Sequence, residues 1–308
     1  MRRILCFVLA VLMLLVFTCG CVKVQEKSGG SDQSSSRQEG GSASSSPDAS
    51  DAGKSGSDSK SGSNDGAGKE VSSGAIYKEP GDELGDFYGY VNDTIGKFER
   101  AFNSYETDDF DLMAATADPM AVTMGILILS SLDYIESGDN PREEGKLNGA
   151  DCVREKNGSK ITFSSKRVRD EDGFDGVSKA GDIVTEAGSL DTAANAAIVE
   201  KTTERDGILL ERSICEVVVL PDGTVIAQFL SKPMPPRDDR VKEKGNAYFA
   251  RYNDKEFEII KADFEPDPNF TYKSIIGNAN ATPESMSEGY VKVRRLTVKD
   301  DAASAEKY

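Results

Sequence analysis

The side chains of this chain that could do chemistry are almost all carboxylates. Its 308 residues include 53 Asp and Glu, five Cys and no His. Without histidine the chain lacks the usual general base near neutral pH, which excludes Ser-His-Asp and Cys-His catalysis. A carboxylate pair can still hydrolyse glycosides, but nothing in the sequence marks two acids as such a pair. We therefore predict a protein that is not an enzyme and has no cofactor, with a carboxylate glycoside hydrolase as the least favoured alternative.

The densest acidic segment, at 170–176, reads DEDGFDG. Closely spaced oxygen ligands of this kind are typical of calcium-binding loops. Phe174, however, stands where the helix-loop-helix calcium register needs a ligand. We therefore interpret the segment as a solvated loop between strands and predict no metal site.

The two cysteines of the globular region, Cys152 and Cys215, both fall in expected strands. An even number of cysteines in an oxidising compartment is typical of a disulfide, and two buried thiols are the alternative. Two sulfurs without histidine cannot form a zinc site of the usual kind. The sequence leaves the choice between disulfide and thiols open.

The N-terminus carries Arg2 and Arg3, an apolar run at 4–17 and the sequence TCGC at 18–21. A charged start, a short apolar run and a small residue before cysteine are features of export signals, and the run is too short to span a bilayer reliably. This segment resembles a bacterial lipoprotein signal peptide, although the family favours Leu where Thr stands three residues before the second cysteine. The resemblance implies a signal at 1–20, lipidation of Cys21 and an acyl anchor in the cell membrane, with the chain on the extracytoplasmic side. An uncleaved anchor or an ordinary secretory signal would give the same side.

Residues 21–75 follow the signal and are rich in Ser, Gly and Asp. A segment with so few apolar side chains cannot offset the entropy lost on folding, so we predict a disordered tether. A flexible coil of about 50 residues has a root-mean-square span of roughly 40 Å. Such a tether would hold a domain off a membrane surface.

We expect one globular domain at 76–299 and a disordered tail at 300–308. Apolar residues recur at steps of three and four from 84 to 105, which predicts an amphipathic helix. They are Leu84, Tyr88, Val91, Ile95, Phe98, Phe102 and Tyr105. A second helix is expected from Asp118, a capping residue followed by Pro119, to about residue 135. Because it is apolar on nearly every side, we expect it to be buried; a membrane span is the alternative, but the run without charge or proline is too short.

Beyond residue 141 the pattern changes to strands separated by turn dipeptides such as Asn157-Gly158 and Asp206-Gly207. These dipeptides favour tight hairpins. The expected strands are 150–155, 160–168, 194–203, 208–220, 224–230, 247–252, 256–262, 269–275 and 290–298. Helices followed by hairpins predict an α+β domain, in which two N-terminal helices pack on a meandering antiparallel β-sheet. The length of several strands would allow that sheet to curve.

The formal net charge is −16, and loss of Arg2 and Arg3 with the signal makes it −18. A strongly acidic domain without a basic stripe is not expected to bind nucleic acid or anionic lipid headgroups, whereas cationic peptides or metal ions remain tolerable partners. The expected partners are the bilayer, through the Cys21 anchor, and an unknown ligand or envelope protein.

The first hypothesis for function is a non-catalytic binding module for an apolar or peptide ligand, held between the sheet and the first helix. Its candidate ligand-lining residues are Phe87, Tyr88, Phe98 and Phe102. The alternative is a structural or protein-interaction module with a filled core, for which an exposed apolar patch is the expected sign.

Overall fold

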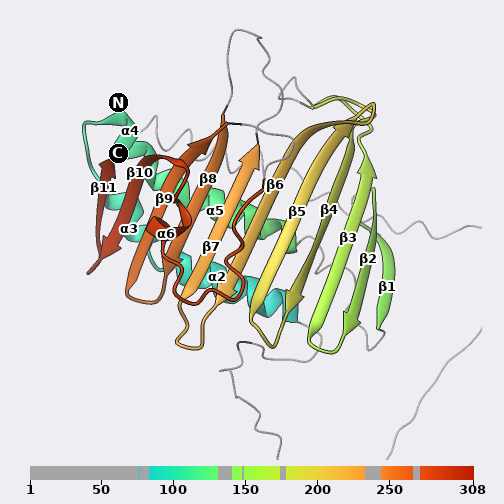
Figure 1. Ribbon diagram of the computed structural model, residues 1–308, viewed down its shortest axis with the longest axis horizontal. Helices are drawn as coiled ribbons and strands as arrows, with labels where there is room; N and C mark the ends of the chain where they lie inside the picture. Colours follow the sequence, from blue (N-terminus) through green and yellow to red (C-terminus); the bar gives the residue numbers. More distant parts are fainter. Residues whose placement is uncertain are drawn as a thin grey trace, which may run out of the picture. The chain divides into compact units, whose positions relative to one another are not determined.

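The computed structural model describes residues 76, 83–130, 141–147, 149–173, 178–232, 244–265 and 271–308. It confirms the α+β class: the helices come first and pack on one face of an antiparallel sheet (Figure 1). The expected signal peptide and tether lie outside the described residues.

The helical layer has five parts: α2 (Glu83–Gly96), α3 (Glu99–Ser104), α4 (Phe110–Met113), the 3-10 helix η1 (Ala114–Ala117) and α5 (Asp118–Ser130). The single helix expected at 84–105 is therefore interrupted between α2 and α3. Gly96 is a poor helix former, and the amide of Phe98 bonds to the carbonyl of Ile95, three residues back, at 3.1 Å. The second helix begins at Asp118, as predicted.

Within the described residues, eleven strands form one sheet in which each strand pairs antiparallel with its neighbours in sequence. They are β1 (Arg142–Leu147), β2 (Ala150–Asn157), β3 (Lys160–Val168), β4 (Ile183–Asp191), β5 (Ala196–Arg205), β6 (Ile208–Val219), β7 (Val225–Lys232), β8 (Gly245–Tyr252), β9 (Glu256–Phe264), β10 (Val291–Lys299) and β11 (Ala302–Lys307). The predicted hairpin turns are confirmed. At the β5–β6 turn, for example, Asp206 and Gly207 have φ values of 52° and 76°, the conformation that this dipeptide favours.

Three strands escaped the sequence pattern, and one expected strand is absent from the described part of its range. The strand β11 occupies the segment expected to be a disordered tail, because pairing with β10 orders a sequence of small residues with little strand preference of its own. The sequence of β1 is too highly charged to be predicted as a strand, and the sequence of β4 contains too many small residues. Residues 271–275, expected to be a strand, instead start an irregular segment.

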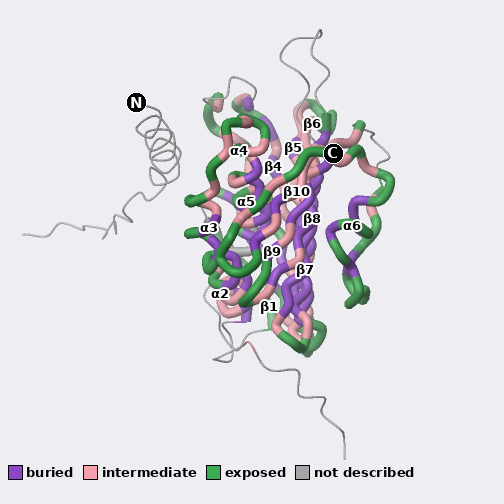
Figure 2. The backbone as a smooth tube through the Cα atoms, turned by 90° about the vertical axis from the view of Figure 1, so that its left-hand side faces the viewer, coloured by how far each residue is buried: buried purple, intermediate pink, exposed green. Residues whose placement is uncertain are grey.

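That irregular segment, residues 271–290, is called the strap below. It crosses the sheet face opposite the helices and contains one short helix, α6 (Pro283–Met286), which Figure 2 shows on the far side of the sheet from α2 and α5. The sheet therefore has an apolar core on each face. The larger core lies under the helices, and the smaller one lies under the strap, where Ile275, Ala281 and Met286 are buried.

Candidate functional site

Of the two alternatives left open for the cysteines of the domain, the structure has the two buried thiols: Cys152 and Cys215 are both free and buried. Cys152 lies in β2 and Cys215 in β6, four strands apart in the sheet. At about 4.8 Å per strand this separates them by roughly 19 Å, whereas a disulfide needs Cα atoms within about 7 Å. Burial raises the pKa of the Cys215 thiol, so this sulfur is an inert core atom at neutral pH. Cys21, the predicted lipidation site, lies outside the described residues.

The predicted ligand-lining aromatics lie in the core under the helices. Phe87 and Phe98 are buried, and Tyr88 and Phe102 are partly buried against the same cluster. The rings of Phe98 and Phe102 lie 5.7 and 5.1 Å from the ring of Phe257 in β9. These distances are typical of direct aromatic packing. The side chains therefore pack against the sheet and one another, which favours the filled-core alternative.

The acidic loop is described only as far as Gly173. Within it, Asp172 accepts hydrogen bonds from the Lys179 ammonium at 2.9 Å and from the Ala180 amide at 3.0 Å, and these bonds lower its pKa. The carboxylate thus organises its own loop. Among the described residues, no group of three or more His, Cys, Asp or Glu side chains is arranged to hold a metal ion.

Glu216, in β6 on the strap side of the sheet, is a buried carboxylate with several partners. One oxygen accepts from the Gln228 amide at 2.7 Å and from the backbone amide of Ile275 at 2.9 Å. The other accepts from the hydroxyls of Ser274 at 2.8 Å and Tyr272 at 3.2 Å. Burial and this carboxylate raise the pKa of Tyr272 to about 12. Glu216 therefore fixes the strap, and a charged residue inside an apolar strand run was the sequence signal that could have identified it.

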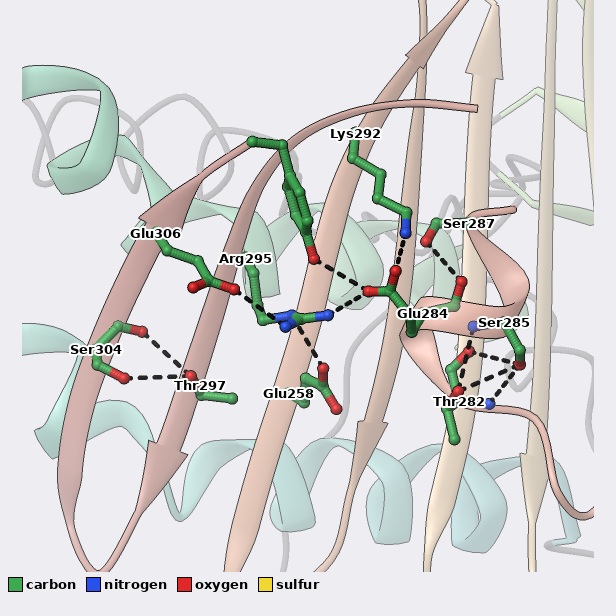
Figure 3. A network of polar contacts seen from close by, with 11 residues as sticks. Glu258, Thr282, Glu284, Ser285, Ser287, Lys292, Arg295, Thr297, Ser304 and Glu306 are labelled. Carbon is green, nitrogen blue, oxygen red and sulfur yellow. Dashed lines mark hydrogen bonds and ion pairs between the residues drawn. The ribbon is translucent and has the colours of Figure 1, made fainter. Parts of the chain in front are cut away.

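The other end of the strap is held by Glu284 of α6 (Figure 3). Its carboxylate pairs with Lys292 and Arg295 of β10 and accepts a 3.1 Å hydrogen bond from the Tyr308 hydroxyl. Arg295 also pairs with Glu258 and Glu306, so the network joins the strap to three neighbouring strands. Lys292, Tyr308 and Arg295 lower the pKa of Glu284. Both acidic attachments of the strap are therefore structural.

The N-terminus of α5 is fixed on the sheet by Asp118 and Arg294. Two guanidinium nitrogens of Arg294 in β10 donate to the two carboxylate oxygens at 2.7 and 2.6 Å. This geometry is the bidentate form that holds both groups in one orientation. Asp118 is 3% exposed; burial raises its pKa against the opposing effect of Arg294. The pair sets which side of α5 faces the sheet.

The outward side of α4, η1 and α5 is apolar, contrary to the expectation of a fully buried helix. Val122 and Ile126 are fully buried against the sheet, but Met120 is 58% exposed, and Met124 and Leu127 are each 39% exposed. Six exposed residues recur at steps of three and four along this helical segment. They are Phe110, Met113, Ala117, Met120, Met124 and Leu127, and we call them the helical seam.

The spacing of the seam is that of the apolar positions in a heptad repeat, which place one stripe along a helix. The positions beside the stripe carry small side chains, namely Ala114, Thr116, Ala121 and Thr123. Small neighbours allow another helix to approach closely. By length and composition the segment Phe110–Leu127 could cross a membrane, but its buried third packs into the core of the domain. The seam is therefore the described surface best suited to an apolar partner.

Acidic residues are frequent in the helical layer that carries the seam. No charged residue occurs between 119 and 130, whereas residues 83–118 carry nine carboxylates and two basic side chains, a net charge of −7. Asp108 and Asp111 are exposed at the α4 end, where Asp109 and Asp111 also bind Lys307 of β11 at 3.0 Å each. An uncharged stripe thus lies in a negative field.

Comparison of the chain with family models, curated proteins and solved structures gave no match.

Proposed function

We propose that this protein is a lipid-anchored lipoprotein of the cell envelope that binds a protein partner and does not catalyse a reaction. The N-terminal sequence supports the anchor at Cys21 and an extracytoplasmic location. The Ser/Gly-rich tether would let the domain reach a partner away from the membrane surface. The helical seam is the proposed docking site.

The observation that carries this proposal is the exposure of the seam. A helix that is apolar all round normally lies inside a protein or a membrane, because water gives no compensation for its outer side chains. In α5 the inner side chains pack on the sheet, whereas the outer ones remain exposed, to as much as 58% at Met120. The packing of Phe98 and Phe102 on Phe257 favours a surface site over a ligand held inside the core.

The test is site-specific photocrosslinking in the native host with the full-length protein. A photoreactive residue replaces Met120, and a matched one replaces Ile208, which is 65% exposed at the far β5–β6 hairpin. We expect one discrete protein adduct at position 120, absent at 208 and lost when Leu127→Asn is added. Equal labelling at both positions, or no adduct at position 120, would contradict a docking role for the seam.

A further inference from the structure

We propose, building on the docking function above, that the partner contributes an amphipathic helix with basic flanks. Its apolar side would pack on the helical seam, and its Lys and Arg residues would face the surrounding acids.

The shape of the seam fits a helix. Its steps of three and four residues match the pattern by which two helices interlock side chains, and Phe110 to Leu127 spans about two and a half heptads. An extended peptide would bind as an added strand along a sheet edge and contact every second residue there, and the seam does not have that spacing. Three of the six seam residues are Met, whose flexible side chain adapts to a partner surface.

The negative charge of the helical layer favours basic residues on both sides of the apolar stripe of the partner helix. The helical layer from 83 to 130 carries a net charge of −7. An approaching acidic helix would be repelled, whereas a basic one would be attracted and oriented by Asp108 and Asp111 at the α4 end. Sheet cations pair with four of the nine carboxylates of this layer: Arg154 and Lys156 with Glu83, Arg294 with Asp118, and Lys307 with Asp109 and Asp111. With these four cations included, the layer keeps a net charge of −3.

The same charge argues against two other occupants. A second copy of this chain would bring an equally acidic helical layer against the first, which costs free energy. An anionic membrane surface would repel the layer in the same way, and the tether provides membrane attachment without it. A basic amphipathic helix of a separate protein can cover the apolar side chains of the seam and can also bring positive charge to the acidic helical layer.

The test measures binding of a designed peptide by fluorescence anisotropy. The probe is a three-heptad helix with Leu at the apolar positions and Lys beside them; its counterpart has Glu in place of Lys. The full-length lipoprotein is held in nanodiscs of neutral phosphatidylcholine, and empty nanodiscs provide the background. We expect saturable binding of the Lys peptide that weakens as salt rises, and at least about tenfold weaker binding of the Glu peptide.

Matched double variants locate the binding surface. Met120→Asn with Met124→Asn is expected to weaken binding of the Lys peptide by at least about tenfold. Val168→Asn with Ile208→Asn removes two side chains that are 55% and 65% exposed elsewhere, and is expected to change binding by less than about twofold. Circular dichroism checks that both proteins are folded. Asp108→Asn with Asp111→Asn is expected to reduce the salt dependence.

Each of the following results would overturn the inference. Equal binding of the Lys and Glu peptides would show that the seam does not select a basic helix. Equal losses of peptide affinity in the two apolar double variants would show that the peptide does not bind at the seam. Concentration-dependent dimerisation abolished by the Met variant would identify a second copy as the occupant. Absence of peptide binding together with binding to phosphatidylglycerol vesicles would identify a membrane. If the Lys peptide fails but the adduct at position 120 persists in cells, the docking function stands and only the partner chemistry is wrong.

Discussion

Replacing Glu216 by Ala should loosen the strap from the sheet. The change removes the acceptor of four hydrogen bonds, and the four donors differ in whether another acceptor is within reach. Tyr272 and Ser274 are accessible enough to bond to water, and the Gln228 amide keeps a 3.0 Å bond to the carbonyl of Lys273. The amide of Ile275 is buried and has no substitute acceptor among the contacts described for it.

The expected magnitude follows from that inventory. An orphaned buried amide costs about 1 to 3 kcal/mol, and the weakened Gln228 bond adds about 1 kcal/mol. We therefore expect the free energy of unfolding to fall by about 2 to 4 kcal/mol. Urea unfolding of the full chain, followed by circular dichroism, measures this loss, and hydrogen exchange should show faster exchange at the Ile275 amide than in the strands.

Two further variants make the reasoning refutable. Glu216→Gln should lose only about 1 kcal/mol, because the hydroxyls of Tyr272 and Ser274 can turn to accept from the new amide group while the amide oxygen keeps the Ile275 bond. Glu200→Ala breaks a half-exposed pair with Arg212 on the same sheet face and should cost less than about 1 kcal/mol. A loss below about 0.5 kcal/mol for Glu216→Ala, or equal losses for the Ala and Gln variants, would refute the assignment.

Three further predictions concern four other substitutions. Gly125→Ala should destabilise the domain by about 1 to 3 kcal/mol, because the new Cβ would lie 2.7 Å from the Phe229 ring. Gly89→Ala should stabilise the domain by up to about 1 kcal/mol, because no atom lies within 4 Å of its new Cβ and alanine favours the helix. Thermal unfolding of the two variants measures both effects. The pKa of Glu284 is lowered in the folded state, so its ionised carboxylate stabilises the strap above the ordinary glutamate pKa of about 4.3, and this stabilisation is lost as the pH falls through the folded pKa. Hydrogen exchange of the α6 amides should therefore become faster in acid. Glu284→Gln should abolish that pH dependence. Cys21→Ala should block acylation and release the protein from the membrane fraction, as metabolic labelling with palmitate and fractionation would show; unchanged labelling would contradict the lipidation site.

The elements that the sequence predicted well are those whose signals are local. The hairpin at Asp206-Gly207 needs only two residues that tolerate positive φ, and the start of α5 needs only a capping Asp followed by Pro. We did not predict the stripe of the helical seam: the helix expected from Asp118 is apolar on nearly every side, and we expected it to be buried. What the spacing did not reveal is that this side of the helix faces outward.

Tertiary structure decided the features that join distant residues. The bidentate contact of Asp118 with Arg294, 176 positions later, orients α5 and so exposes the seam. The separation of Cys152 from Cys215 depends on the order of the intervening strands, and β11 is ordered by its partner β10. The sequence by itself determined the periods and turns, because these depend on a few neighbouring residues. Burial, pairing and exposure depend on which distant segments meet, and only the folded chain brings those together.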